Sequence, residues 1–350
     1  MQITTIGLDL AKSVFQVHGV DAEGKVVVAK ALRRSQVLAF FAKLPRCLVG
    51  MEACATAHHW ARQLGTLGHE VRLIPPAYVK PYVRRGKNDA ADAAAICEAV
   101  TRPSMRFVAV KPVEAQAALM AHRVRDLLIR QRTQLINALR AHLAELGLVA
   151  AQGRDGLSTL VDLIEAEGAN ELPMSVRAAL RPLVAQLDAL QPQIGFLEKT
   201  IHAQHKRSEV SRRLETIPGV GVIVATALTA TVTDPGAFKS GRDLAAWIGL
   251  VPRQRSSGGK ERLGSISKQG DRYLRKLMVG GASAVVRYAR QKPGTYPWLD
   301  GLLARRPAKV VIVALANKIA RITWVIMARG ETYRAPLFAA GAAKGSAMGA

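Results

Sequence analysis

Short apolar runs alternate with helical patterns over the first hundred residues of the chain. Apolar runs bounded by turn residues predict strands, and apolar residues three or four apart predict helices. The predicted strands cover residues 3–8, 14–20, 25–32, 47–51 and 71–74. Helical patterns lie at residues 35–43 and 58–67, and a further helix follows Pro75 and Pro76. The predicted element order is therefore βββαβαβ followed by a helix.

Two long helical stretches follow, at residues 113–148 and 175–207. In the second, seven apolar residues are spaced alternately three and four apart, as in the a and d positions of a heptad repeat. They are Leu180, Leu183, Leu187, Leu190, Ile194, Leu197 and Ile201. Such a seam predicts either an antiparallel helical pair or an oligomerising coiled coil. Pro182 and Pro192 predict a kink in this helix or a late start.

The pattern changes again after residue 213. Short helices precede a glycine-rich basic segment, a final amphipathic helix and a low-complexity tail that we expect to be disordered. The fold class is therefore α/β plus all-α: an N-terminal domain with the element order of RNase H-like folds, a helical middle and a mainly helical C-terminal domain. The expected boundaries are residues 1–112, 113–207, 208–335 and 336–350.

The net charge of this chain is far more positive than that of an average globular protein. Lysine and arginine number 50 against 26 aspartate and glutamate residues, which leaves a formal charge of +24. So large an excess favours a polyanionic partner, and nucleic acid is the first candidate. Between residues 251 and 309 there are 14 basic residues and three acidic ones, so we expect phosphate contacts there. The alternative is a solvated basic surface, or one that holds ribosomal RNA.

The cysteines and the apolar segments also indicate the cellular location. Cys47, Cys54 and Cys97 have neither zinc-ligand spacing nor the number of a disulfide framework, so we expect reduced thiols and no structural zinc. The N-terminus lacks a signal pattern, and the most apolar helix, at about residues 308–327, is interrupted by Asn317, Lys318 and Arg321. We expect a cytoplasmic, nucleoid-associated protein without a membrane span.

Four acidic residues stand near predicted strand ends or on a predicted helix. They are Asp9, Glu52, Asp89 and Asp92. A spacing of three puts the carboxylates of Asp89 and Asp92 on one helix face. Carboxylates from separate elements that converge on one sheet edge suit Mg²⁺. Any one of these acids alone is more often a helix cap or a solvated residue, and salt bridges to Lys12 or Lys87 are the main competing interpretation.

Two hydroxyl groups, those of Ser256 and Ser257, lie in a glycine loop among basic side chains. A serine in such a loop can approach a DNA phosphate closely, and the cations would stabilise the charge of the attacked phosphate. A plain flexible linker is the alternative interpretation.

The turn at residues 217–221 lies between two helical stretches and resembles a helix-hairpin-helix element. In such an element the glycine turn presents backbone N–H groups to phosphate. A tight turn without a ligand is the alternative. The candidate nucleic-acid contacts are Gly219, Gly221, Arg253, Arg255, Lys260, Arg262, Lys268, Arg272 and Arg275.

These segments together resemble a known family over almost the whole chain. The motifs are GLDLAK, MEA, KNDAADA, LETIPGVG, WIGLVPRQRSSGGKERLGSISKQGDRYLR and ANKIARITW. They are similar to the DEDD-type insertion-sequence transposases of the family numbered one-ten, in particular its eleven-eleven subgroup. The resemblance implies a RuvC-like domain, a coiled-coil insertion and a C-terminal transposase domain. It also implies a recombinase guided by a structured non-coding RNA, called bridge RNA or seekRNA.

The resemblance assigns roles to particular residues. It implies that Asp9, Glu52, Asp89 and Asp92 are the Mg²⁺ ligands, and that Ser257 is the nucleophile that bonds covalently to a DNA phosphate, with Ser256 as its nearest rival. It implies double-stranded DNA and a guide RNA as partners, and a site composed from two protomers within a dimer of dimers. The main alternative is a RuvC-like nuclease that uses metal-activated water. A third is a non-catalytic nucleic-acid-binding protein.

Overall fold

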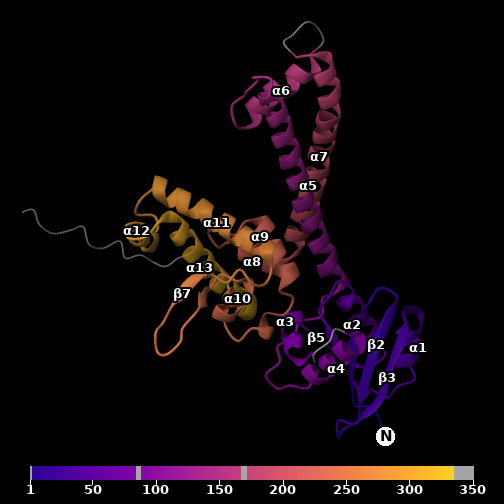
Figure 1. Ribbon diagram of the computed structural model, residues 1–350. Helices are drawn as coiled ribbons and strands as arrows, with labels where there is room; N and C mark the ends of the chain where they lie inside the picture. The colour runs from indigo at the N-terminus through magenta and orange to yellow at the C-terminus, as the bar shows by residue number, and fades with distance from the viewer. Residues whose placement is uncertain (1, 84–87, 167–171, 335–350) are drawn as a thin grey trace, which may run out of the picture. The chain divides into compact units, whose positions relative to one another are not determined.

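The computed structural model describes residues 2–83, 88–166 and 172–334 (Figure 1). The chain forms two compact units. Unit 1 is Met1–Ala117 with Val232–Ala237, and unit 2 is Ala118–Thr231 with Phe238–Ala350. Lys87 and the tail at 336–350 that we expected to be disordered lie outside the described residues. The three-domain boundaries at residues 112 and 207 stay predictions.

Unit 1 is built on one mixed sheet. Its strands are β1 (Thr5–Asp9), β2 (Val14–Val20), β3 (Val26–Arg33), β4 (Leu48–Glu52) and β5 (Glu70–Ile74). Their order is β3-β2-β1-β4-β5, with β1 antiparallel to β2 and parallel to β4. The helices are α1 (Val37–Phe41), α2 (Ala57–Thr66), α3 (Pro76–Val79) and α4 (Asp89–Val100). The predicted βββαβαβ order is confirmed, and the sheet is consistent with an RNase H-like domain.

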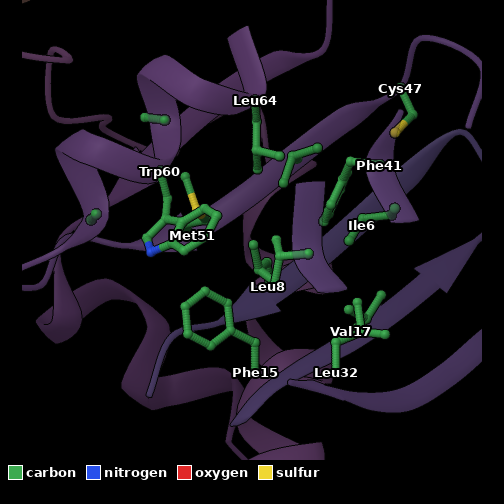
Figure 2. Close-up of a cluster of buried hydrophobic side chains, with 14 of the residues drawn as sticks. Ile6, Leu8, Phe15, Val17, Leu32, Phe41, Cys47, Met51, Trp60 and Leu64 are labelled. Carbon is green, nitrogen blue, oxygen red and sulfur yellow. The ribbon is translucent and has the colours of Figure 1, made fainter. Parts of the chain in front are cut away.

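One face of this sheet is apolar because every second residue of its central strands points toward it. Ile6 and Leu8 of β1 are fully buried there, together with Phe15 of β2 (Figure 2). Trp60 of α2 packs edge-on against Phe15, with ring centroids 5.0 Å apart. Side chains of α1 and α2, among them Phe41, complete the cluster. This packing fixes α2 against the sheet.

The helix α4 packs on the other face, directly against the backbone of β1 and β4. Gly7 and Gly50 are paired across these two strands. A Cβ atom on Gly7 would lie 2.0 Å from the carbonyl oxygen of Ala93, and one on Gly50 would lie 2.8 Å from Cβ of Val100. Any larger residue would clash, so these two glycines determine where α4 lies on the sheet.

The first part of unit 2 is a helical hairpin. Its helices are α5 (Val113–Ala144), α6 (Arg154–Glu165) and α7 (Met174–Arg207). Arg125 of α5 donates to Glu198 of α7 at 2.9 Å, and Arg132 donates to Gln191 at 2.8 Å. Because residue numbers rise along α5 as they fall along α7, the two helices are antiparallel.

The predicted heptad residues of α7 are largely buried within this single chain. Leu187 and Leu190 are 8% and 9% exposed, and Ile201 is 0% exposed. The structure therefore shows the antiparallel pair, and no second chain is needed to cover this seam. The helix continues through Pro182 and Pro192, so the late start predicted from these prolines is wrong.

The rest of unit 2 is mainly helical. Its helices are α8 (Glu209–Glu215), α9 (Val222–Thr231), α10 (Gly241–Ile248), α11 (Arg272–Gln291), α12 (Pro297–Leu303) and α13 (Ala308–Arg329), and a short hairpin consists of β6 (Pro252–Gln254) and β7 (Leu263–Ile266). Among the described helices, α13 alone has the length and apolar composition of a membrane span. It packs against α8, α10 and α11, and Asn317 donates to the carbonyl of Leu250 at 3.2 Å. These contacts are those of a core helix.

A buried histidine joins three helices of unit 2. The ring of His122 on α5 has Nδ1 3.1 Å from the Tyr273 hydroxyl of α11 and Nε2 3.0 Å from Oγ1 of Thr226 on α9. The Thr226 hydroxyl donates to the carbonyl of Val222 at 2.7 Å, so it accepts from Nε2–H, and Nδ1 accepts from Tyr273. Burial, followed by the nearby Arg125 charge, lowers the pKa of His122 to about 4. The imidazole is therefore neutral in the folded protein at neutral pH.

Substitution of Gly7 tests how closely α4 packs on the sheet. We expect Gly7→Ala to lower the free energy of unfolding by about 1 to 3 kcal/mol, because the new methyl group overpacks the contact with Ala93. Gly65→Ala in α2 is the matched control: a Cβ there meets nothing within 4 Å, and alanine favours a helix by up to about 1 kcal/mol. Urea denaturation measures both. Equal stabilities of Gly7→Ala and wild type would mean that α4 lies elsewhere.

The neutral His122 predicts a loss of stability in mild acid. Its folded-state pKa of about 4 lies below the ordinary value of 6.5, so between these values the unfolded chain binds a proton that the folded chain does not. Stability should therefore fall with pH in this window, by about 2 kcal/mol between pH 7 and pH 5. His122→Gln should remove that part of the loss, whereas His142→Gln, at an exposed position, should not. Urea unfolding at pH 7 and pH 5 measures the free energy of unfolding of the wild type and both variants. Identical losses of stability in all three proteins would contradict the role of His122.

Candidate active site

Two of the predicted acids end neighbouring parallel strands. Asp9 is the last residue of β1 and Glu52 is the last residue of β4. The register pairs Leu8 with Met51, so the two acids are the next residues along each strand. Asp9 lies two residues after Gly7 and Glu52 two residues after Gly50. Because side chains alternate along a strand, both acids face the side of the sheet that carries α4.

The other two acids lie in the first turn of α4. Asn88 caps this helix, since its side chain accepts from the backbone N–H of Ala90 at 2.8 Å. The thiol of Cys97, further along α4, lies 3.9 Å from the carbonyl of Thr5, so α4 runs antiparallel to β1 and begins at the carboxyl edge of the sheet. Asp89 and Asp92 therefore meet the strand ends, at a helix N-terminus that favours negative charge.

The resulting cluster is compact. Asp9, Asp89 and Asp92 each offer a carboxylate oxygen, and these oxygens all lie within 4.8 Å of one another. Burial, followed by the charges of Asp92, Asp89 and Glu52, raises the pKa of Asp9 to about 6. Burial and the charge of Asp92 also raise the pKa of Glu52. All four predicted acids are thus electrostatically coupled, although Glu52 stands outside the tightest group.

The competing salt-bridge interpretation depends on a cation beside these acids. Among the described residues, no basic side chain forms an ion pair with Asp9 or Glu52, and Lys12 has no ion pair at all. Lys87 lies outside the described residues. Oxygens bound to one small divalent ion lie within about 4.2 Å of each other, so small rotations of the three closest carboxylates would bring them onto one ion. This donor set fits a divalent cation.

The two predicted serines lie at the end of the β6–β7 hairpin in unit 2. Ser257 bridges to Lys260, and the two residues between them, Gly258 and Gly259, have φ of 56° and 75°. Positive φ at both central positions is the geometry of a tight hairpin turn. The Ser256 hydroxyl accepts the backbone N–H of Arg262 at 3.2 Å. The Ser257 hydroxyl is exposed and has no hydrogen-bond partner among the described residues.

The predicted phosphate-binding cations differ in their surroundings. Arg253 donates to the carbonyl of Ser267 at 3.1 Å. Arg275 donates to the carbonyls of Ile248 and Gln269 at 2.8 and 2.7 Å, which gives it a structural role. Side chains without a protein partner among the described residues are those of Arg255, Lys260, Arg262, Lys268 and Arg272. Nucleic-acid contacts for all seven stay predictions.

The glycine turn between α8 and α9 packs against α11. Gly219 has φ of 88°, which favours glycine. A Cβ on Gly281 of α11 would lie 1.9 Å from the carbonyl oxygen of Gly219. By contrast, Gly221 is exposed and a Cβ there would meet nothing within 4 Å. Packing therefore explains Gly219, and phosphate binding by either glycine stays a prediction.

Comparisons with known proteins agree with this arrangement. Residues 6–147 match a DEDD-type IS110 transposase family, and residues 211–296 match the family described as "Transposase IS116/IS110/IS902 family". A probable family 20 transposase of Pseudomonas aeruginosa is 51% identical over 336 residues, which cover 95% of this chain and 99% of the relative. The chain belongs to the IS116/IS110/IS902 family of transposases.

Further relatives of this transposase carry the names of insertion sequences. The transposase for IS1111A of Coxiella burnetii is 42% identical, over 95% of this chain and 92% of the relative. The transposase for IS1328 of Yersinia enterocolitica is 40% identical, over 95% of this chain and 98% of the relative. The family resemblance inferred from the motifs is confirmed. This protein is an insertion-sequence transposase, an enzyme of DNA strand cleavage and transfer.

Gly7 and Gly50 were not predicted from the sequence, although they allow α4, which carries Asp89 and Asp92, to pack directly on the sheet. The signal was present: each lies two residues before an acid at the end of a predicted strand, in the segments GLD and GME. A glycine at that position in two strands indicates that another backbone lies directly on the sheet.

Substitution of Asp9 in this transposase tests the cluster. In EDTA at pH 7.5, we expect Asp9→Asn to raise the free energy of unfolding by about 1 to 2 kcal/mol, because it relieves carboxylate repulsion at a partly screened site. The pKa of Asp9 is raised from 3.8 to about 6, so the fold loses stability as the pH rises from 3.8 to about 6, and the full loss is present above about pH 6. The gain in Asp9→Asn should therefore shrink as the pH falls and vanish at about pH 3, where Asp9 is mostly protonated in both states. Glu23→Gln, in the exposed turn after β2, should give no such gain. Urea denaturation at both pH values measures it.

The same variants test the cation. Millimolar Mg²⁺ or Mn²⁺ should raise the melting temperature of the wild type and of Glu23→Gln, but much less that of Asp9→Asn, because a ligand that binds only the folded state stabilises it. Equal stabilisation of all three proteins would place the bound ion outside this cluster.

Proposed function

We propose that this transposase cuts DNA by attack of Ser257 on a backbone phosphate, with Mg²⁺ held by Asp9, Glu52, Asp89 and Asp92. The observation that carries the proposal is the contrast between two adjacent hydroxyls: that of Ser256 holds the hairpin through Arg262, whereas that of Ser257 is exposed and has no partner among the described residues. The cations around it, Arg255 and Lys260, supply positive charge for a phosphate. The acidic cluster supports the metal part of the proposal.

The proposed step forms one bond and breaks another. The oxygen of Ser257 bonds to phosphorus and its proton passes to water, while the bond from phosphorus to the strand's 3′ oxygen breaks. The released 3′ oxygen takes up a proton from water and becomes a 3′ hydroxyl. When bound, Mg²⁺ would polarise the attacked phosphate and favour the deprotonated serine. A 3′ hydroxyl of a partner strand then displaces Ser257 and restores the diester. The covalent bond conserves the energy of the cut strand, so the step needs no nucleotide cofactor.

Two further parts of the proposal concern partners. Double-stranded DNA from the element ends and the target is the substrate, and a structured guide RNA selects the sites. The net charge of +24 supports a polyanionic partner of either kind. A dimer of dimers would hold the two recombining duplexes together. With the heptad seam of α7 buried inside the chain, its interfaces would use other surfaces.

A RuvC-like nuclease is the second candidate function. One observation favours it: all four acids come from unit 1, so the cluster is complete without the serine of unit 2. In that case water is the nucleophile and Ser257 only contacts phosphate.

Substitution of Ser257 separates these two functions. We expect Ser257→Ala to bind DNA as the wild type does, because Arg255, Lys260 and Arg262 remain, but to give neither a covalent adduct nor a cut strand. Ser257→Cys should keep a trace of adduct, since a thiolate is nucleophilic but suits a metal-bound phosphate poorly. Ser256→Ala is the matched control and should lose only one exposed hydrogen bond, worth about 0.5 to 1.5 kcal/mol. A denaturing gel with labelled DNA measures cleavage and adduct.

Cleavage by Ser257→Ala at the wild-type rate would assign the attack to water and support the nuclease. Loss of the adduct in Ser256→Ala together with its retention in Ser257→Ala would assign the attack to the other serine.

A further inference from the structure

A cluster of basic side chains lies in unit 1, outside the acidic site. A pocket of about 650 Å³ opens between the loop after β1, the end of β3 and the first turn of α2. Its basic side chains are those of Lys12, Arg33, Arg34 and His59, its hydroxyls are those of Ser13 and Ser35, and none of the described residues that line it is acidic. We call these six residues, with Trp60 as the wall, the cationic pocket.

The charges of the cationic pocket are not neutralised by the protein. Among the described residues, Lys12, Arg33 and Arg34 form no ion pair with any carboxylate, and all three are exposed. Like charges gathered around one hollow repel each other unless an anion enters it. Three cations together with hydroxyl donors are the groups that bind phosphate oxygens.

Arg34 is held in place before any ligand arrives. Its backbone N–H donates to the carbonyl of Ser13 at 2.8 Å. Its guanidinium lies 5.2 Å from the ring centre of Trp60 and 5.7 Å from that of Phe15, and both rings belong to the buried cluster of the sheet. A cation stacked on fixed aromatic rings loses little freedom on binding a phosphate.

The wall of the pocket contains a donor without an acceptor. Trp60 is 4% exposed, and its Nε1 is buried with no hydrogen-bond partner among the described residues. In Figure 2 this nitrogen lies at the rim of the apolar cluster, away from Ile6 and Phe41. A buried indole N–H without an acceptor is destabilising, and such groups are rare in folded proteins.

The cationic pocket and the acidic cluster share one edge of the sheet. Val14, which also lines the pocket, begins β2. Arg33 pairs with Val14 at the end of β3, and Asp9 at the end of β1 pairs with Gln16 of β2. Lys12 is three residues after Asp9, so their Cα atoms lie within about 11 Å. The 11 Å figure is the greatest separation of these two Cα atoms, and successive phosphates of one DNA strand lie at least about 3.4 Å apart. The two residues therefore span at most about three nucleotides of one strand.

We propose that the cationic pocket binds a phosphate of the DNA strand on which the acidic cluster acts, within about three nucleotides of the phosphate that is cut. The inference rests on the proposed function, because it takes the acidic cluster to act on DNA. Lys12 and Arg34 hold the backbone of the strand, and neither takes part in bond making. They are positioning residues that fix which phosphate reaches the acids.

The test removes charge while it keeps side-chain length. For a DNA duplex of the element's end, Lys12→Gln/Arg34→Gln should reduce the slope of log affinity against log salt by about 0.9, the value for one phosphate that the protein no longer neutralises. Lys12→Gln alone should reduce the slope by part of that amount, because Arg34 still contacts the phosphate. This single variant tests the pocket without disturbing the stacked arginine, should the double variant fold poorly. Lys25→Gln/Arg46→Gln removes the same charge at exposed positions on the opposite edge of the sheet and should leave the slope near that of the wild type.

A modified substrate locates the contact. A neutral methylphosphonate is placed at each position in turn within about three nucleotides of the mapped cleavage point. At one of these positions it should weaken binding by the wild type about tenfold, which corresponds to one charge-assisted contact. It should have little further effect on the double variant, because the two changes remove the same interaction. Full sensitivity of the double variant, or an unchanged salt slope in both pocket variants, would overturn the proposal. So would weaker binding of an RNA hairpin with DNA binding unchanged.

Failure of this inference differs from failure of the proposed function. If the pocket binds no DNA, Asp9→Asn still abolishes cleavage while the pocket variants cut like the wild type. If the acidic cluster does not act on DNA, Asp9→Asn itself cuts at the wild-type rate.

Discussion

The acidic site depends on the direct contact of α4 with the backbone of β1 and β4. Gly7 and Gly50 lack side chains where the helix crosses, so α4 lies closer to the sheet than any larger residue would permit. The same alternation that turns these glycines toward α4 turns Asp9 and Glu52 toward its first turn. One packing contact therefore brings together acids from three separate elements.

That contact also works against electrostatic repulsion. Burial and the neighbouring carboxylates raise the pKa of Asp9 to about 6, which means that the fold holds these acids together at a cost in stability. Such a cost is typical of functional sites, where geometry is retained although it destabilises the free protein. The apolar cluster on the opposite face, which includes the contact between Phe15 and Trp60, supplies the rigidity that keeps the strand ends in register.

In unit 2, residues of the same chemical type differ in whether their side chains have a partner among the described residues. Ser256 and Ser257 are adjacent, yet one hydroxyl supports the hairpin and the other has no partner among the described residues. Both Arg272 and Arg275 lie on α11. Arg275 donates to the backbone carbonyl of Ile248 at the end of α10, whereas Arg272 is exposed and has no partner in the described part of the chain. Composition shows that this segment is basic, and only the contacts show which of its charges are available to a phosphate.

The sequence by itself determined the element order of unit 1 and the family, and it pointed to the four acids, whose role stays a prediction. Strand and helix patterns arise from neighbouring residues, and the motifs are contiguous. The tertiary structure alone decided that the seam containing Leu187 is covered within the chain, and that Gly7 touches α4. It also showed that His122 is neutral between two hydroxyls. These properties depend on residues far apart along the chain, whose distances and burial no local pattern specifies. A heptad pattern in the sequence is the same whether its apolar residues pack against another chain or against an earlier helix of the same chain. Only the folded structure shows which of the two covers them.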